Sequence, residues 1–214
     1  MSKSIEKFLT ESKMAVDNGI NKSSIAVRLG NLGYGTEQMN VGVNLVNEAT
    51  QLHQNQKKEY GEQYAATDYV DMAIKALNGV YMNHLQLARI VFKNERGISE
   101  ALQLTGKRKR VIPEYLAQVG LFYNNALSTL TVMEGMKRFN VLEEHLQNGL
   151  TLLNSANAAY QQQKKEKGEA QEATELRDAK LEELEEWMGD YLKVARIAVA
   201  DSPQLLEALG IVVS

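Results

Sequence analysis

The chain has 214 residues, a net charge of −3 and no cysteine. The lack of cysteine excludes disulfides, thiolate metal sites and a cysteine nucleophile. A charge this small argues against both a general nucleic-acid-binding surface and a strongly acidic, solvated chain. With two prolines and no β-branched runs of period two, the sequence favours helix nearly throughout.

The N-terminal residues carry charge throughout and lack the apolar core of a signal peptide, and no later stretch approaches about 18 apolar residues. We therefore expect a soluble, cytoplasmic protein with no membrane partner.

The first helix is predicted from about Ser4 to Leu29. In its middle, Asn18-Gly19 indicates a kink, with a complete break as the alternative, because glycine costs about 1 kcal/mol relative to alanine inside a helix.

The second predicted helix spans about Glu37 to Tyr60 and follows a glycine-rich connection. Gly61 fits the left-handed position just past a helix end. After a turn of about six residues, Thr67 is predicted to cap a third helix. A short helical segment, GISEALQL, follows that helix.

The basic segment 107–113 is predicted to be a linker, and Pro113 is predicted to begin the fourth helix. This helix should run to about Lys137. The fifth is predicted from about Leu142 to Lys167, followed by Gly168, and the sixth from about Glu175 to Ala200. The segment SPQLLEALGI then forms a second short helix, with proline at its first position.

Residues separated by 107 positions match along much of the chain. Between Gly42 and Leu102, 22 of 61 positions are identical to the residue 107 later. A period this long indicates a duplicated half-domain of several helices. The sequence thus predicts an all-α fold of six main helices, arranged as two tandem three-helix repeats with approximate two-fold symmetry and a short helical segment after each. The repeats are predicted at 1–106 and 114–214 and are expected to pack as one domain.

Arg89 and Arg196 occupy equivalent positions of the repeat and are candidate ligand-binding residues. Each lies in an apolar segment, LARIVF or VARIAVA, where a buried guanidinium needs a carboxylate or several carbonyl partners. We expect structural ion pairs with Glu100 and Glu207. The alternative is that one arginine holds a small anionic ligand in an interhelical pocket.

Two threonine–aspartate pairs form a second set of candidates. Thr67 and Asp71, like Thr174 and Asp178, are four residues apart and share a helix face. Helix-start chemistry is the favoured interpretation, and two equivalent polar ligand sites are the alternative. Nothing supplies a third member for nucleophilic catalysis, so no catalytic residue is predicted.

The three histidines each stand alone in the sequence. None of His53, His84 and His145 has a glutamate three residues before it, so the Glu-x-x-His pairs of di-iron bundles are missing. We predict no metal site and no cofactor, and we expect His84 to be a hydrogen-bonded core residue. Trp187 is expected to cover either a second helix or a partner protein.

Lys107 to Arg110 form the one dense basic cluster, in a stretch expected to be a mobile linker. Without interleaved aromatic residues or a recognisable module, this cluster is a weak basis for nucleic-acid binding. We expect a non-enzymatic, intracellular interaction or scaffold protein that binds a protein partner or a second copy of itself. The alternative is small-molecule or anion binding, including enzymatic activity, in an interhelical pocket that uses Arg89 or Arg196.

Overall fold

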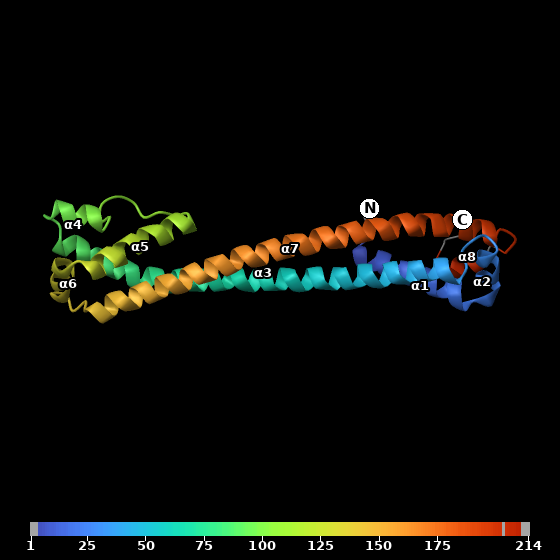
Figure 1. Cartoon of the computed structure of the whole chain (residues 1–214), viewed down its shortest axis with the longest axis horizontal. Helices are drawn as coiled ribbons and strands as arrows, with labels where there is room; N and C mark the ends of the chain where they lie inside the picture. Colours follow the sequence, from blue (N-terminus) through green and yellow to red (C-terminus); the bar gives the residue numbers. More distant parts are fainter. Residues whose placement is uncertain (1–3, 203, 211–214) are drawn as a thin grey trace. The chain divides into compact units, whose positions relative to one another are not determined.

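The computed structural model describes residues 4–202 and 204–210, which form eight α-helices and no strand (Figure 1). This confirms the prediction of an all-α fold. None of the helices in these residues is long and apolar enough to cross a membrane. The helices are α1 (Ile5–Asn21), α2 (Ser23–Gly30), α3 (Thr36–Val91), α4 (Arg96–Ala101), α5 (Ile112–Ser128), α6 (Leu130–Lys137), α7 (Glu143–Ala198) and α8 (Gln204–Ala208).

The helices α3 and α7 differ most from the prediction, because each is one continuous helix of 56 residues. The ends predicted at Gly61 and Gly168 and the caps predicted at Thr67 and Thr174 are therefore wrong. Each threonine hydroxyl donates to the carbonyl four residues earlier, over 2.9 Å from Thr67 and 2.8 Å from Thr174. This bond forms inside helices, whereas a cap accepts from a backbone amide. The Ala, Gln, Glu and Lys residues around each glycine favour helix and offset its cost of about 1 kcal/mol.

The first and fourth predicted helices are each divided in two. Lys22, with φ −89° and ψ 101°, separates α1 from α2, and Thr129, with φ −114° and ψ 106°, separates α5 from α6. The kink expected at Gly19 is thus a complete break a few residues later. Gly19 itself is a point of close approach, because a Cβ added there would lie 2.2 Å from the hydroxyl of Tyr191 on α7.

The two short helices predicted after the main helices are confirmed as α4 and α8. Pro113 is also confirmed in the first turn of α5, which begins one residue earlier, at Ile112. Pro203, expected to start the last helix, lies outside the described residues. The α2–α3 connection contains Gly33 with φ +89°, a conformation that favours glycine.

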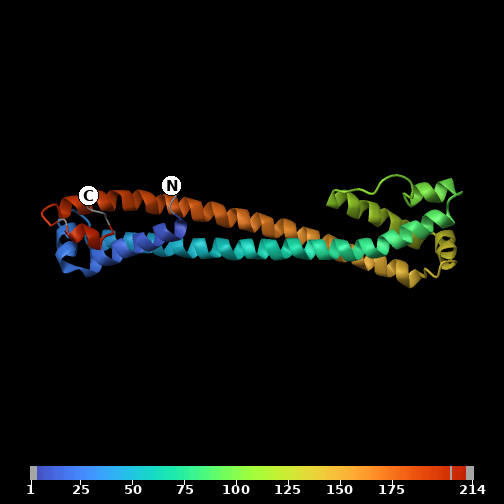
Figure 2. The same cartoon turned by 180° about the vertical axis from the view of Figure 1, so that it is seen from behind.

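The chain divides into two compact units. The first comprises Met1–Tyr60 and Glu169–Ser214, and the second comprises Gly61–Gly168. The first unit therefore contains α1, α2 and α8 with the N-terminal part of α3 and the C-terminal part of α7. The second contains α4, α5 and α6 with the remaining parts of the two long helices. Figure 2 shows the same elements from behind.

In the first unit, the core lies between α1, α2, α3 and α7. Trp187 stacks on Tyr191 with ring centroids 5.1 Å apart and an interplanar angle of 16°. The indole covers Gly42 of α3, where an added Cβ would lie 2.2 Å from the ring. Trp187 thus packs on a second helix, one of its two expected roles. Fully buried residues of this core include Val16, Ile25, Leu29, Ala49, Leu184, Tyr191 and Ala195.

The core of the second unit is rich in aromatic side chains. Tyr81 contacts Phe122 edge-on with centroids 5.4 Å apart, and Phe122 contacts Tyr123 in the same way at 5.2 Å. His84 Nδ1 lies 3.1 Å from the hydroxyl of Tyr123, which confirms His84 as a hydrogen-bonded core residue. Burial lowers the pKa of His84 and raises the pKa of Tyr115 to about 12. The charged forms of these side chains are therefore disfavoured in the folded unit.

The helix boundaries recur along the chain. Every first and last residue of α1, α2 and α3 lies 107 positions before the corresponding residue of α5, α6 and α7. The two breaks at Lys22 and Thr129 also differ by 107 positions. Equivalent positions in the two halves of the chain can therefore be compared side chain by side chain.

Candidate functional site

A groove of about 660 Å³ lies between α5 and α7 in the second unit. Its floor is apolar, because Leu116 and Leu153 are each only 4% exposed. Asn154 and Asn157 are exposed and give the groove polar edges. No acidic or basic side chain is among its lining residues, which are Pro113, Leu116, Ala117, Gly120, Leu121, Asn124, Leu150, Leu153, Asn154, Asn157, Tyr160 and Gln161.

Helical spacing places these residues together. On α5 the lining positions 113, 116, 117, 120, 121 and 124 follow the i, i+3, i+4, i+7 pattern of one helix face, and positions 150, 153, 154, 157, 160 and 161 do the same on α7. Gly120 lies in the middle of the α5 face. A Cβ added there would make an ordinary contact, 3.5 Å from Leu153. The missing side chain therefore leaves the groove open at this position.

The equivalent place in the first unit is spanned by charged side chains. Glu6 on α1 pairs with Lys57 on α3, and this lysine lowers the pKa of the Glu6 carboxyl group. In the second unit the equivalent residues are Pro113 and Lys164, which cannot form that ion pair. Lys164 instead lies over the ring of Tyr160, with its Nζ 5.4 Å from the ring centroid. The two helices beside the groove are thus not joined by this salt bridge.

Arg89 lies at the surface of α3, so the expectation that it is buried is wrong. Its Nε donates to the carbonyl of Leu104 over 2.6 Å, and its Nη2 donates to the carbonyl of Gly106 over 3.4 Å. Within the described parts of the chain it forms no ion pair with Glu100, contrary to expectation. The chain after α4 brings two carbonyl groups to the guanidinium, and these satisfy it instead.

Arg196 is also exposed, although the preceding Ala195 is completely buried. Successive residues of a helix point about 100° apart, so a buried alanine directs the next side chain away from the core. The expected ion pair between Arg196 and Glu207 does not occur in residues 4–202 and 204–210. Neither arginine lines the groove between α5 and α7.

The threonine–aspartate pairs are not brought together as sites. The Thr67 hydroxyl accepts a hydrogen bond from Gln163 Nε2 over 3.2 Å, whereas Asp71 is exposed. Asp178 is exposed as well, and one of its carboxylate oxygens accepts from the neighbouring Arg177 Nε over 2.8 Å. Thr174 is partly buried and donates only within its helix. In the described residues, neither aspartate forms a hydrogen bond with its paired threonine.

The basic segment after α4 is held against the second unit. The Arg108 guanidinium lies 5.0 Å from the ring centroid of Tyr115 and donates to the side chain of Asn78. The backbone amide of Lys109 donates to Gln118 Oε1 over 3.1 Å. These contacts tie the segment to α3 and α5.

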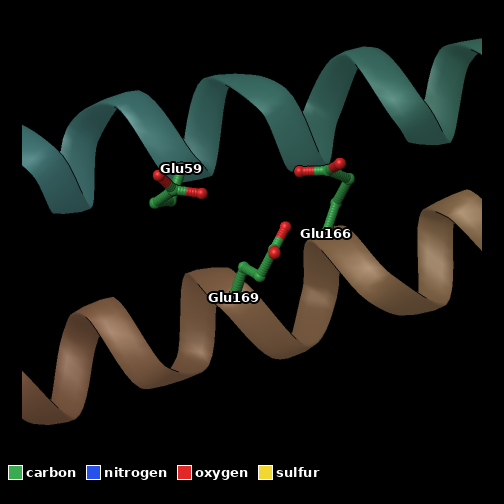
Figure 3. A group of neighbouring side chains, drawn as sticks. All are labelled: Glu59, Glu166 and Glu169. Carbon is green, nitrogen blue, oxygen red and sulfur yellow. The ribbon is translucent and has the colours of Figure 1, made fainter.

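A group of glutamates lies on the long helices (Figure 3). Glu59 of α3 and Glu169 of α7, both in the first unit, offer carboxylate oxygens within 4.8 Å of each other. Glu166 lies one helical turn before Glu169 but belongs to the second unit, and its carboxylate accepts from Gln162. Lys58 Nζ lies 3.5 Å from the Glu59 carboxylate and partly balances its charge. Nearby acidic side chains of this kind are common without an ion, so they define no metal centre.

No protein-family model, curated protein or solved structure matches this chain. The geometry of its own residues is therefore the basis for a functional proposal. The sequence-based candidates did not include the groove, because none of its lining residues is unusual alone. The available signal was a difference between the halves, in which Pro113 and Tyr160 stand where Glu6 and His53 stand 107 positions earlier.

Proposed function

We propose that this protein is a non-enzymatic interaction module built from two tandem repeats, 1–106 and 114–214, joined by the basic segment 107–113. The recurring helix boundaries support a repeat, because both ends of three successive helices recur at the same shift of 107 positions as the matching residues. The absence of cysteine fits a reducing compartment such as the cytoplasm.

Packing around two equivalent glycines gives further support for the repeat. A Cβ on Gly149 would lie 2.1 Å from the ring of Tyr123, and a Cβ on Gly42 would likewise overlap with the indole ring of Trp187. In the first unit the large side chain over the glycine comes from α7, and in the second it comes from α5. The glycine is therefore the feature that both halves share, whereas the rings that cover it come from non-equivalent positions.

The groove between α5 and α7 is the observation that supports binding of a protein partner. We infer that it takes an amphipathic helix, because an apolar floor between two helices receives apolar side chains spaced three and four residues apart. The uncharged lining selects a partner face without buried charges, since an unpaired charge in the groove would be costly. Asn154 and Asn157 can hydrogen-bond polar groups beside that apolar stripe.

The alternative of an anionic ligand at Arg89 or Arg196 has less support. The Arg89 guanidinium already donates to two carbonyl groups. Arg196 is exposed and lies outside the groove. The protein-binding proposal uses neither residue and assigns no catalytic step.

A matched pair of variants tests the groove. Asn154→Arg places a long charged side chain at the groove edge, and Asn47→Arg makes the same change at the equivalent exposed position of α3. Proteins captured by the tagged chain are identified by quantitative mass spectrometry, and helical segments of those proteins are synthesised and titrated by fluorescence anisotropy.

We expect Asn154→Arg to weaken peptide binding at least about tenfold, or about 1.4 kcal/mol, because the longer side chain crowds the groove edge and replaces an amide that can hydrogen-bond the partner. Asn47→Arg should bind like the unchanged protein. Equal binding by both variants would contradict the proposal. Sedimentation velocity of the three proteins shows whether the partner is a second copy of this chain, in which case only Asn154→Arg lowers the dimer fraction.

A further inference from the structure

A pocket of about 350 Å³ lies in the first unit and shares no lining residue with the groove described above. It is enclosed by α1, α2, the connection after α2 and the first turn of α3. Its volume is at the lower end of the range for small-molecule sites, so its ligand must be small. The lining residues are Gly19, Ile20, Ala26, Val27, Gly30, Tyr34, Gly35, Thr36, Met39 and Asn40.

The pocket exists because several lining positions carry small side chains or none. Ala26 and Gly35 correspond to Met133 and Leu142 in the second half of the chain, 107 positions later. Gly30 likewise corresponds to Lys137. Met133 packs against the core of its own unit. The same helical framework therefore accommodates larger side chains, and the first unit omits them.

Neither the backbone φ angle nor steric overlap with neighbouring atoms requires glycine at positions 30 and 35. A Cβ added at either glycine meets no atom within 4 Å, and neither residue is among those with positive φ. Gly19 differs, because the Tyr191 hydroxyl lies against it. A larger side chain at either lining position would therefore meet no steric obstacle from the fold.

The lining specifies the chemistry of a ligand. It contains no acidic, basic or histidine side chain, so it suits an uncharged molecule. The Tyr34 ring and the Met39 thioether provide surfaces that favour an aromatic ring. Met39 is only 3% exposed. Thr36 and Asn40 supply a hydroxyl and an amide at the start of α3. Ile20 and Val27 are 40% and 65% exposed and form an apolar rim.

We propose that this pocket binds a small, uncharged aromatic molecule with one hydrogen-bonding group. The ring lies against Tyr34 and Met39, and the polar atom reaches Thr36 or Asn40. The proposal does not depend on the protein-binding groove, because the two sites lie in different units and share no residue.

Three related probes test the ligand chemistry. Benzyl alcohol has the proposed features, benzoate replaces its neutral group with a charge, and cyclohexylmethanol lacks the aromatic ring. Binding is followed by the methyl NMR signal of Met39 in ¹³C-methionine-labelled protein and by the fluorescence of Trp187. That residue is the only tryptophan, and its ring centroid lies 5.8 Å from that of Tyr34.

We expect a saturable shift of the Met39 signal with benzyl alcohol and binding at least about tenfold weaker for the other two probes. Equal binding of benzoate would overturn the uncharged specificity, and equal binding of cyclohexylmethanol would overturn the aromatic one. No saturable response to benzyl alcohol would overturn the site itself.

Substitutions taken from the second half of the chain locate the response. Gly35→Leu and, separately, Ala26→Met should each fill the pocket and reduce benzyl alcohol affinity at least about tenfold. Gly79→Leu is the control, because Gly79 lies in the second unit and a Cβ added there meets no atom within 4 Å. Circular dichroism identifies variants that fold, and unchanged affinity in either folded pocket variant would overturn the proposal. Asn154→Arg should still bind benzyl alcohol, whatever its effect on the groove.

Discussion

The contact between Gly42 and Trp187 gives a sharp test of packing in the first unit. A Cβ added at Gly42 would lie 2.2, 2.6 and 2.7 Å from three atoms of the indole ring. Gly42→Ala should gain about 1 kcal/mol from helix propensity and lose about 1–3 kcal/mol from overpacking. In Gly189→Ala the added Cβ meets no atom within 4 Å, so only the gain applies. The two variants should therefore differ in stability by about 1–3 kcal/mol, with Gly42→Ala the less stable.

Urea unfolding followed by far-ultraviolet circular dichroism measures this difference. The double variant Gly42→Ala/Trp187→Val removes the indole and places valine where Val80 stands in the other half of the chain. In the Trp187→Val background, Gly42→Ala should stabilise the protein as Gly189→Ala does. If Gly42→Ala were as stabilising as Gly189→Ala with the tryptophan present, the close approach of α3 and α7 would be refuted.

Two further results follow from particular contacts in the second unit. Burial lowers the pKa of His84, so below about pH 6.5 the unfolded chain binds a proton that the folded unit does not. The free energy of unfolding, measured with urea, should then fall as the pH falls toward the pKa of His84 in the folded protein, by up to about 1.4 kcal/mol per pH unit. His84→Gln should remove this contribution. Arg89→Met removes the hydrogen bonds to two carbonyls near the basic segment. In Arg89→Met, trypsin should cleave at Lys107 to Arg110 several-fold faster than it does in the control variant Arg196→Met. Equal cleavage rates in the two variants would show that Arg89 does not hold this segment.

The helical class and much of the core could be predicted, because both depend on composition and on a period of 3.6 residues. On α7, for example, Leu184, Tyr191 and Ala195 follow this period and are fully buried. His84, predicted to be a hydrogen-bonded core residue, is likewise buried. These predictions succeed because helical geometry fixes which side chains share a face.

The ends of helices were predicted less well, because capping residues permit a helix to end without forcing it to. Lysines before Gly61 and a threonine after it suggest an end and a new start, yet a continuous α3 keeps every internal hydrogen bond. The break at Lys22 is indicated by the positions of the apolar residues on its two sides, and not by a capping residue. In an uninterrupted helix, Ile25 and Leu29 would lie opposite the buried Leu9 and Val16. The break rotates the chain and brings both sides into one core.

The environment of Arg89 was mispredicted because an apolar segment was equated with a buried one. In LARIVF the core positions are Ala88 and Phe92, which are four residues apart and 0% and 1% exposed. Ile90 is 57% exposed despite its apolar side chain. Spacing, more than the composition of the segment, therefore decides which side chains are buried. The carbonyl partners of Arg89 depend on the path of the chain after α4, which no local pattern indicates.

The two proposed binding sites could not be found from residues shared by the halves of the chain. Shared residues such as Gly42 and Gly149 support packing, and shared arginines lie at the surface. The groove and the pocket instead occur where the halves differ. The first unit has the ion pair between Glu6 and Lys57, whereas in the second unit Lys164 lies over the ring of Tyr160. The second unit has Met133 and Leu142 where the first has Ala26 and Gly35. If the halves began as copies, packing constraints would preserve the shared residues, whereas binding a distinct ligand would change one copy only. Both proposals therefore place binding at equivalent, structurally permissive positions where the two halves differ.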